Sequence, residues 1–170
     1  AGTKYKEQTT KIFNSEEWKE VRLDIEAETK PDIVASILDM SCIDDGTYDA
    51  VYSAHNIEHV YAHEVITALN EFKRVLNDDG FLILTCPDIK RVCALIGEGK
   101  IGELLYTAAI GDVYPLDVLY GFRRTIADGW YDMAHKNGFT GESLNDWLRL
   151  SSFKSFITAQ DENKYALWAI

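Results

Sequence analysis

Two histidines and a glutamate follow one another in an order that could bind a metal ion. His55, Glu58 and His59 form the pattern H-x-x-E-H, which one class of zinc hydrolase uses. That chemistry needs both histidines one turn apart on a helix, a third ligand, and a glutamate that activates bound water. Here the pattern directly follows residues 48–54 (YDAVYSA), an apolar run typical of a β-strand. The sequence therefore predicts the exit of a strand and no metal site.

Composition limits the class of protein. The chain has 170 residues, 46% hydrophobic and 26% charged, which suits one compact domain spanning residues 1–170. Its 28 acidic and 17 basic residues give a net charge of -11, which would repel nucleic acid and anionic membranes alike. Three cysteines without paired spacing favour a reducing, cytoplasmic setting. We expect neither a nucleic-acid nor a membrane partner; the oligomeric state is left open.

Apolar patterns predict the elements that position these residues. Helical spacing of apolar side chains covers one face of residues 63–76, and Asn77–Gly80 (NDDG) closes that helix. A strand, this helix and a second buried strand form a βαβ unit, which implies a parallel sheet. The predicted strands of this half are residues 20–26, 32–37, 48–54 and 81–86.

The second half of the chain ends in a helix and a hairpin. Residues 89–96 are predicted to be helical, and Thr140 is a candidate N-cap for a later helix. Strands at 153–159 and 164–170, separated by QDEN, predict an antiparallel hairpin. Residues 104–130 show no single period. The predicted fold class is α/β: a mostly parallel sheet flanked by helices, with an antiparallel C-terminal hairpin.

These phrases resemble a known family. RLDIE, PDIVASILDMSCIDDGTYDAVYSAHNIEHV and EFKRVLNDDGFLILTCPD, in that order, are similar to the core of class I S-adenosylmethionine-dependent methyltransferases. The likeness is to the group that methylates small molecules and ends its fourth strand in an "LEHV"-like phrase. HKNGFTGESLNDWLRLSSFKSF resembles that group's closing helix and hairpin. The resemblance implies a doubly wound, seven-stranded Rossmann-like sheet that binds S-adenosylmethionine at the carboxyl ends of its strands.

The resemblance also implies which residues bind that cofactor. Asp24, followed by Ile25, matches the acidic position after the second strand, whose carboxylate accepts hydrogen bonds from both ribose hydroxyls. Asp39 and Met40 match the segment that faces adenine, and His55 matches the strand exit beside the methionine moiety.

The Gly-rich loop after the first strand is the part of the family pattern that this chain lacks. Gly2 is the only glycine near the start that could belong to it. Loss of a central strand would leave two buried strand edges unpaired, so we expect residues before Ala1 in the natural protein.

The resemblance implies methyl transfer from S-adenosylmethionine to an unidentified small-molecule acceptor. His59 and His135 are the candidate catalytic residues, as a base or as acceptor ligands; packing or capping is the alternative role. Residues 90–139 are expected to be a substrate-covering insertion that selects the acceptor. A non-catalytic relative that keeps the fold as a binding or scaffold module is the alternative function.

Overall fold

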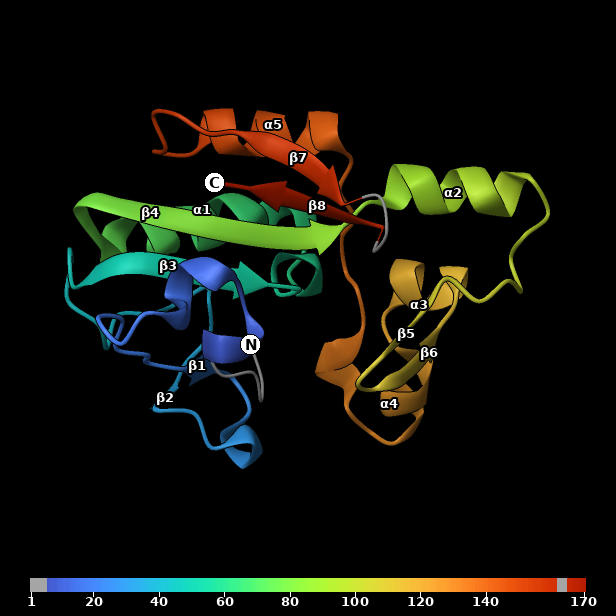
Figure 1. The fold of residues 1–170 in the computed structure, drawn as a ribbon, viewed down its shortest axis with the longest axis horizontal. Helices are drawn as coiled ribbons and strands as arrows, with labels where there is room; N and C mark the ends of the chain where they lie inside the picture. Colours follow the sequence, from blue (N-terminus) through green and yellow to red (C-terminus); the bar gives the residue numbers. More distant parts are fainter. Residues whose placement is uncertain (1–5, 162–164) are drawn as a thin grey trace.

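The main sheet has four strands in the part of the chain that the structure describes. The computed structural model describes residues 6–161 and 165–170 (Figure 1). The strand order is β3-β4-β8-β7, where β3 and β4 pair in parallel and the other two pairs are antiparallel. The bounds are β3 Tyr48–Ala54, β4 Leu76–Pro87, β7 Thr158–Asp161 and β8 Ala166–Ala169. The predicted α/β class is confirmed, but the main sheet is smaller and more mixed than the predicted doubly wound sheet.

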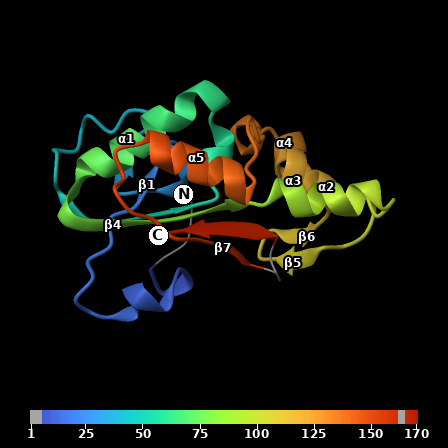
Figure 2. The same ribbon diagram turned by 90° about the horizontal axis from the view of Figure 1, so that it is seen from above.

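Helices cover one face of this sheet. The crossover between β3 and β4 contains the 3-10 helix η5 (Ala62–Glu64) and the helix α1 (Val65–Val75), and α5 (Gly141–Leu150) lies beside α1 on the same face (Figure 2). Thr140 caps α5 as predicted, because its hydroxyl accepts a hydrogen bond from the Ser143 amide. Short 3-10 helices near the N-terminus, η1 (Lys6–Gln8) and η2 (Lys11–Asn14), cover part of the opposite face.

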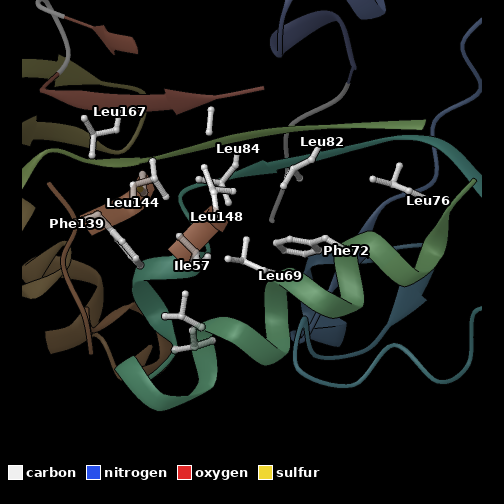
Figure 3. Packing of buried hydrophobic residues seen from close by; sticks show 14 of the residues in the cluster. Ile57, Leu69, Phe72, Leu76, Leu82, Leu84, Phe139, Leu144, Leu148 and Leu167 are labelled. Atoms are coloured by element: carbon white, nitrogen blue, oxygen red, sulfur yellow. The ribbon is translucent and has the colours of Figure 1, made fainter. Parts of the chain in front are cut away.

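The hydrophobic core lies between the sheet and these two helices (Figure 3). Each fully buried large apolar side chain contributes about 1.5–3 kcal/mol by leaving water. Core residues that are fully or almost fully buried come from η4, α1, β4, α5, β8 and the segment before α5, and they include Ile57, Leu69, Phe72, Leu84, Phe139, Leu144, Leu148 and Leu167. On the other face, the Phe13 ring packs edge to face against Tyr52, with 6.0 Å between centroids.

A separate parallel pair of short strands precedes the main sheet. β1 (Leu23–Asp24) pairs with β2 (Ile33–Val34), and the 3-10 helix η3 (Ala27–Thr29) connects them. The predicted strands at 20–26 and 32–37 are therefore correct in place and too long. Alternation of apolar residues indicates a strand, but the length of a strand depends on a paired neighbour, which only tertiary structure supplies.

Several predicted boundaries were wrong. β4 begins at Leu76, so Asn77–Gly80 lies within its span, where the register shifts from Tyr48–Leu76 to Ala50–Phe81. Such a bulge keeps both ends of a strand paired around turn-forming residues, which the sequence pattern could not distinguish from a loop. β7 lies at Thr158–Asp161 instead of 153–159. Residues 162–164, between β7 and β8, fall outside the described part of the chain.

Residues that follow β4 build a small subregion with its own core. It contains α2 (Ile89–Gly97), β5 (Tyr106–Ala108), β6 (Gly111–Val113), α3 (Pro115–Tyr120), α4 (Arg123–Ala127) and the 3-10 helix η6 (Tyr131–Met133). Val92, Val113, Val118 and Phe122 form its hydrophobic cluster. Figure 1 shows this subregion beside the main sheet. Among the described residues, every helix is too short or too polar to cross a bilayer.

Candidate functional site

A groove separates the β1–β2 pair from the main sheet. It has a volume of about 230 Å³ and is lined by Leu23 of β1, Ile33 of β2 and one edge of β3. Within the described residues, β3 pairs only with β4, so its edge toward the groove carries no strand. Ser53, Ala54 and the following Asn56 line the groove where β3 ends. The carboxyl end of β3 therefore opens into this groove.

Asp24 ends β1 beside the groove. Its side chain is buried, and its Oδ1 accepts a hydrogen bond from the Glu26 amide at 2.9 Å. Leu23, the preceding residue, lines the groove, whereas Asp24 is not among the lining residues. This amide bond orients the carboxylate within the turn after β1 and uses only one of its oxygens.

The other predicted cofactor residues are not all at the groove. Met40 is buried and lines it, but Ile25 and Asp39 are exposed. Asp39 lines a different hollow, beside α1, and hydrogen bonds from the side chain of Ser41 and then from its amide lower the pKa of the Asp39 carboxyl group. Gly2 lies outside the described residues. The structure thus brings Met40 to the groove and leaves Asp39 facing away from it.

Arg74 of α1 holds the segment that carries Asp39 and Met40. Its guanidinium donates to the carbonyl oxygens of Met40 at 2.8 Å and Ile43 at 2.7 Å, and it pairs with Glu71 at 2.7 Å. Arg74 also donates a hydrogen bond to the Asp45 carboxylate at 2.8 Å. The hydrogen bonds with Glu71 and with Asp45 raise the pKa of Arg74 above its ordinary value. The hollow that contains Asp39 is therefore lined by side chains that already bind one another.

His55 turns the chain out of β3. Its backbone has a φ of 54°, a left-handed conformation that is uncommon for a residue with a side chain. The amide of His55 still donates to the Thr85 carbonyl oxygen at 2.9 Å, which extends the pairing with β4 by one residue. The 3-10 helix η4 (Ile57–His59) follows immediately. The predicted strand exit matches this geometry, and the H-x-x-E-H residues do not lie on one α-helix.

The structure brings the two predicted catalytic histidines together. The rings of His59 and His135 pack edge to face, with 4.9 Å between centroids. The segment that carries His135 docks on η4, because the amides of Lys136 and Asn137 both donate to the Glu58 carbonyl oxygen, at 2.9 and 3.1 Å. His59 ends η4, just after β3, whereas His135 follows η6 at the end of the subregion, so only the fold could place them side by side.

Glu58 joins this pair, which sequence reasoning missed. Its side chain is 1% exposed, and one carboxylate oxygen lies within 4.8 Å of a ring nitrogen of His59 and of His135. Burial alone would raise the pKa of Glu58, but the hydrogen bond with His55 and the neighbouring histidines lower it below its ordinary value. Burial lowers the pKa of His135, which favours its neutral imidazole. The adjacent Glu58 and His59 were visible in the sequence as two members of this cluster. The sequence did not show that His135 packs against them.

Three solved structures share the fold of this chain. They are a protein from Pyrococcus horikoshii OT3 (15% identity, TM-score 0.54), a SAM-dependent methyltransferase from Archaeoglobus fulgidus (13%, 0.50), and a SAM-dependent methyltransferase from Thermotoga maritima described as a possible histamine N-methyltransferase (16%, 0.52). The matches cover 86%, 82% and 84% of this chain and 68%, 53% and 66% of theirs. They show a Rossmann-like α/β fold.

Residues 5–84 match the family model of the methyltransferase domain, and this stretch contains β1 to β3, the groove and most of β4. This match covers 80 of the 170 residues, and it makes this part of the chain similar to methyltransferase domains. Two of the three solved structures are named as SAM-dependent methyltransferases. No protein of curated function matches the chain.

Two side chains at or beside the groove have the chemistry that a nucleoside would require. A ribose presents two adjacent hydroxyl donors, and Asp24 offers a carboxylate with one oxygen already oriented by the Glu26 amide. Met40 can supply apolar contact from the groove. Gly2, the one residue that could belong to the family's glycine-rich loop, lies outside the described part of the chain.

Proposed function

We propose that this protein transfers a methyl group from S-adenosylmethionine to a small-molecule acceptor. The sulfonium supplies an activated methyl group and a good leaving group. The chain then has to align the acceptor with the methyl carbon and exclude water. A general base is needed only when the acceptor must lose a proton.

The observation that carries the proposal is the position of Asp24. It stands at the end of β1, buried beside the groove into which the carboxyl end of β3 also opens. Open α/β sheets bind nucleotides at the carboxyl ends of their strands. We assign the Asp24 carboxylate to the ribose hydroxyls and the exit of β3, from Ser53 to His55, to the methionine end of the cofactor.

We assign the acceptor to the side of the site formed by the subregion within residues 90–139. His59 and His135 meet where this subregion returns to the exit of β3, which supports a role for both in contacting the acceptor. The separate hydrophobic cluster of the subregion supports the idea that it can vary in shape without disturbing the main core. The acceptor itself is not specified by these contacts.

Calorimetric titration with S-adenosylmethionine tests the cofactor assignment. Loss of a charged hydrogen-bonding partner should make Asp24→Ala bind the cofactor about 1–3 kcal/mol more weakly than the parent chain. Asp146→Ala is the matched control, since Asp146 is an exposed carboxylate on α5 that pairs with Arg149. Equal affinities for the two variants would refute the ribose assignment. An absence of heat from the parent chain would favour a non-catalytic binding module.

A further inference from the structure

Glu58 has one carboxylate oxygen without a partner. Its Oε1 lies 3.1 Å from Nδ1 of His55, whereas Oε2 is buried and has no hydrogen-bond partner among the described residues. Burying a carboxylate oxygen that binds nothing costs free energy, so such an atom needs a ligand of some kind. The residues that surround it decide what that ligand can be.

The two histidines beside Glu58 are oriented by backbone carbonyl groups. Nδ1 of His59 lies 3.2 Å from the Ala134 carbonyl oxygen, and Nδ1 of His135 lies 2.9 Å from that of Val118. A carbonyl oxygen only accepts hydrogen bonds, so each Nδ1 carries a proton and donates it. Nε2 of each neutral ring then keeps its lone pair. Histidines that bind metal ions are usually oriented by this kind of Nδ1 hydrogen bond.

Together these groups make a ligand set of two imidazoles and one carboxylate. One ligand atom from each of Glu58, His59 and His135 lies within 4.8 Å of the other two. Zinc at about 2.0–2.2 Å from tetrahedral ligands holds them about 3.4 Å apart. Both histidines are only half-buried, so small rotations that keep their Nδ1 hydrogen bonds can bring the ring nitrogens closer to the carboxylate.

We propose that Glu58, His59 and His135 bind one divalent first-row transition metal ion, with zinc as the probe. Two imidazole nitrogens and one carboxylate oxygen suit ions of this class and leave a further coordination position for water. His55 takes no place in the ligand set and orients the glutamate through Oε1. The ligands therefore differ from those that the H-x-x-E-H spacing suggested, because His135 replaces His55.

Zinc titration of the parent chain and its histidine variants tests this site. Exposed Cys42 and Cys93 could bind zinc on their own, so both are replaced by serine in every sample. We expect one zinc ion per chain. His59→Ala and His135→Ala should each bind zinc about 100-fold more weakly or worse, which exceeds the 10–100-fold loss typical of residues that only hydrogen-bond to a metal ligand. His63→Ala is the matched control, because His63 is exposed and stands outside the cluster; its zinc affinity should be unchanged.

A second measurement avoids any variant that fails to fold. In the parent chain, zinc should shift the imidazole NMR signals of His59 and His135 while leaving those of His63 in place. The proposal is overturned if the parent chain shows no saturable zinc binding, if His135→Ala and His63→Ala differ less than tenfold, or if the His63 signals shift instead. The titration contains no S-adenosylmethionine, so its outcome is independent of the proposed methyl transfer.

Discussion

His59 and His135 lie edge to face, with 4.9 Å between their ring centroids and 79° between their planes. His59 lies just after β3. His135 lies just after η6, the last element of the subregion that begins with α2. Their contact therefore links the edge of the sheet that we assign to the cofactor with the part of the molecule that we assign to the acceptor.

We predict that Asp39→Ala leaves the affinity for S-adenosylmethionine within about threefold, a small change compared with the loss of a charged hydrogen bond. The Asp39 side chain is exposed in the hollow beside α1, away from the groove that Met40 lines. Calorimetry on Asp24→Ala and Asp39→Ala side by side makes the comparison. A large loss of affinity for S-adenosylmethionine in Asp39→Ala would contradict this prediction and support the adenine contact that the family resemblance implies.

Gly121→Ala should destabilise the protein far more than Gly129→Ala. Both glycines have a positive φ, 91° and 100°, but a Cβ at Gly121 would collide with the Met133 carbonyl oxygen, whereas none of the described atoms lies within 4 Å of one at Gly129. We expect a cost of about 1 kcal/mol at Gly129 from backbone strain and about 3 kcal/mol or more at Gly121.

Urea unfolding of the two glycine variants measures that difference. Because Met133 lies two residues before His135, Gly121→Ala should also weaken zinc binding, while Gly129→Ala should not. Similar unfolding midpoints for the two variants would mean that the chain between α3 and η6 can shift without cost.

The ion pair of Asp117 and Arg123 should make stability depend on acid pH. Burial alone would raise the pKa of Asp117, but the hydrogen bonds that Arg123 and the Tyr114 amide donate lower it below its ordinary value. A carboxyl group with a lowered pKa in the folded state stabilises the protein above its unfolded pKa. That contribution is lost as the pH falls through the folded pKa.

Asp117→Asn should therefore be less stable than the parent chain at pH 7, by about 1 kcal/mol for one partly exposed charged hydrogen bond. The difference should shrink below about pH 4, where the unfolded carboxyl group takes up its proton. Asp146→Asn, in an exposed pair with Arg149, is the control and should show little effect at any pH. A difference that stays constant from pH 7 to pH 3 would rule out ionisation as its source.

The sequence by itself determined the class of the fold and the order of its main elements. The apolar run of β3, the amphipathic face of α1 and the capped start of α5 each depend on neighbours along the chain, so local periodicity predicts them. The same is true of the strand exit at His55, because a run of apolar residues ends there. The strand lengths of β1, β2 and β7, and the bulge at Asn77–Gly80, depend on pairing with distant segments and were predicted wrongly.

Only the tertiary structure decided which polar side chains share a site. The family resemblance grouped Asp24 with Asp39, but Arg74 holds the segment after β2 so that Asp39 lines another hollow. The spacing of H-x-x-E-H grouped His55 with His59, but the left-handed turn at His55 separates their roles, and hydrogen bonds to the Glu58 carbonyl oxygen bring His135 in its place. Spacing along a chain specifies a shared face only within one regular element, and these residues belong to several.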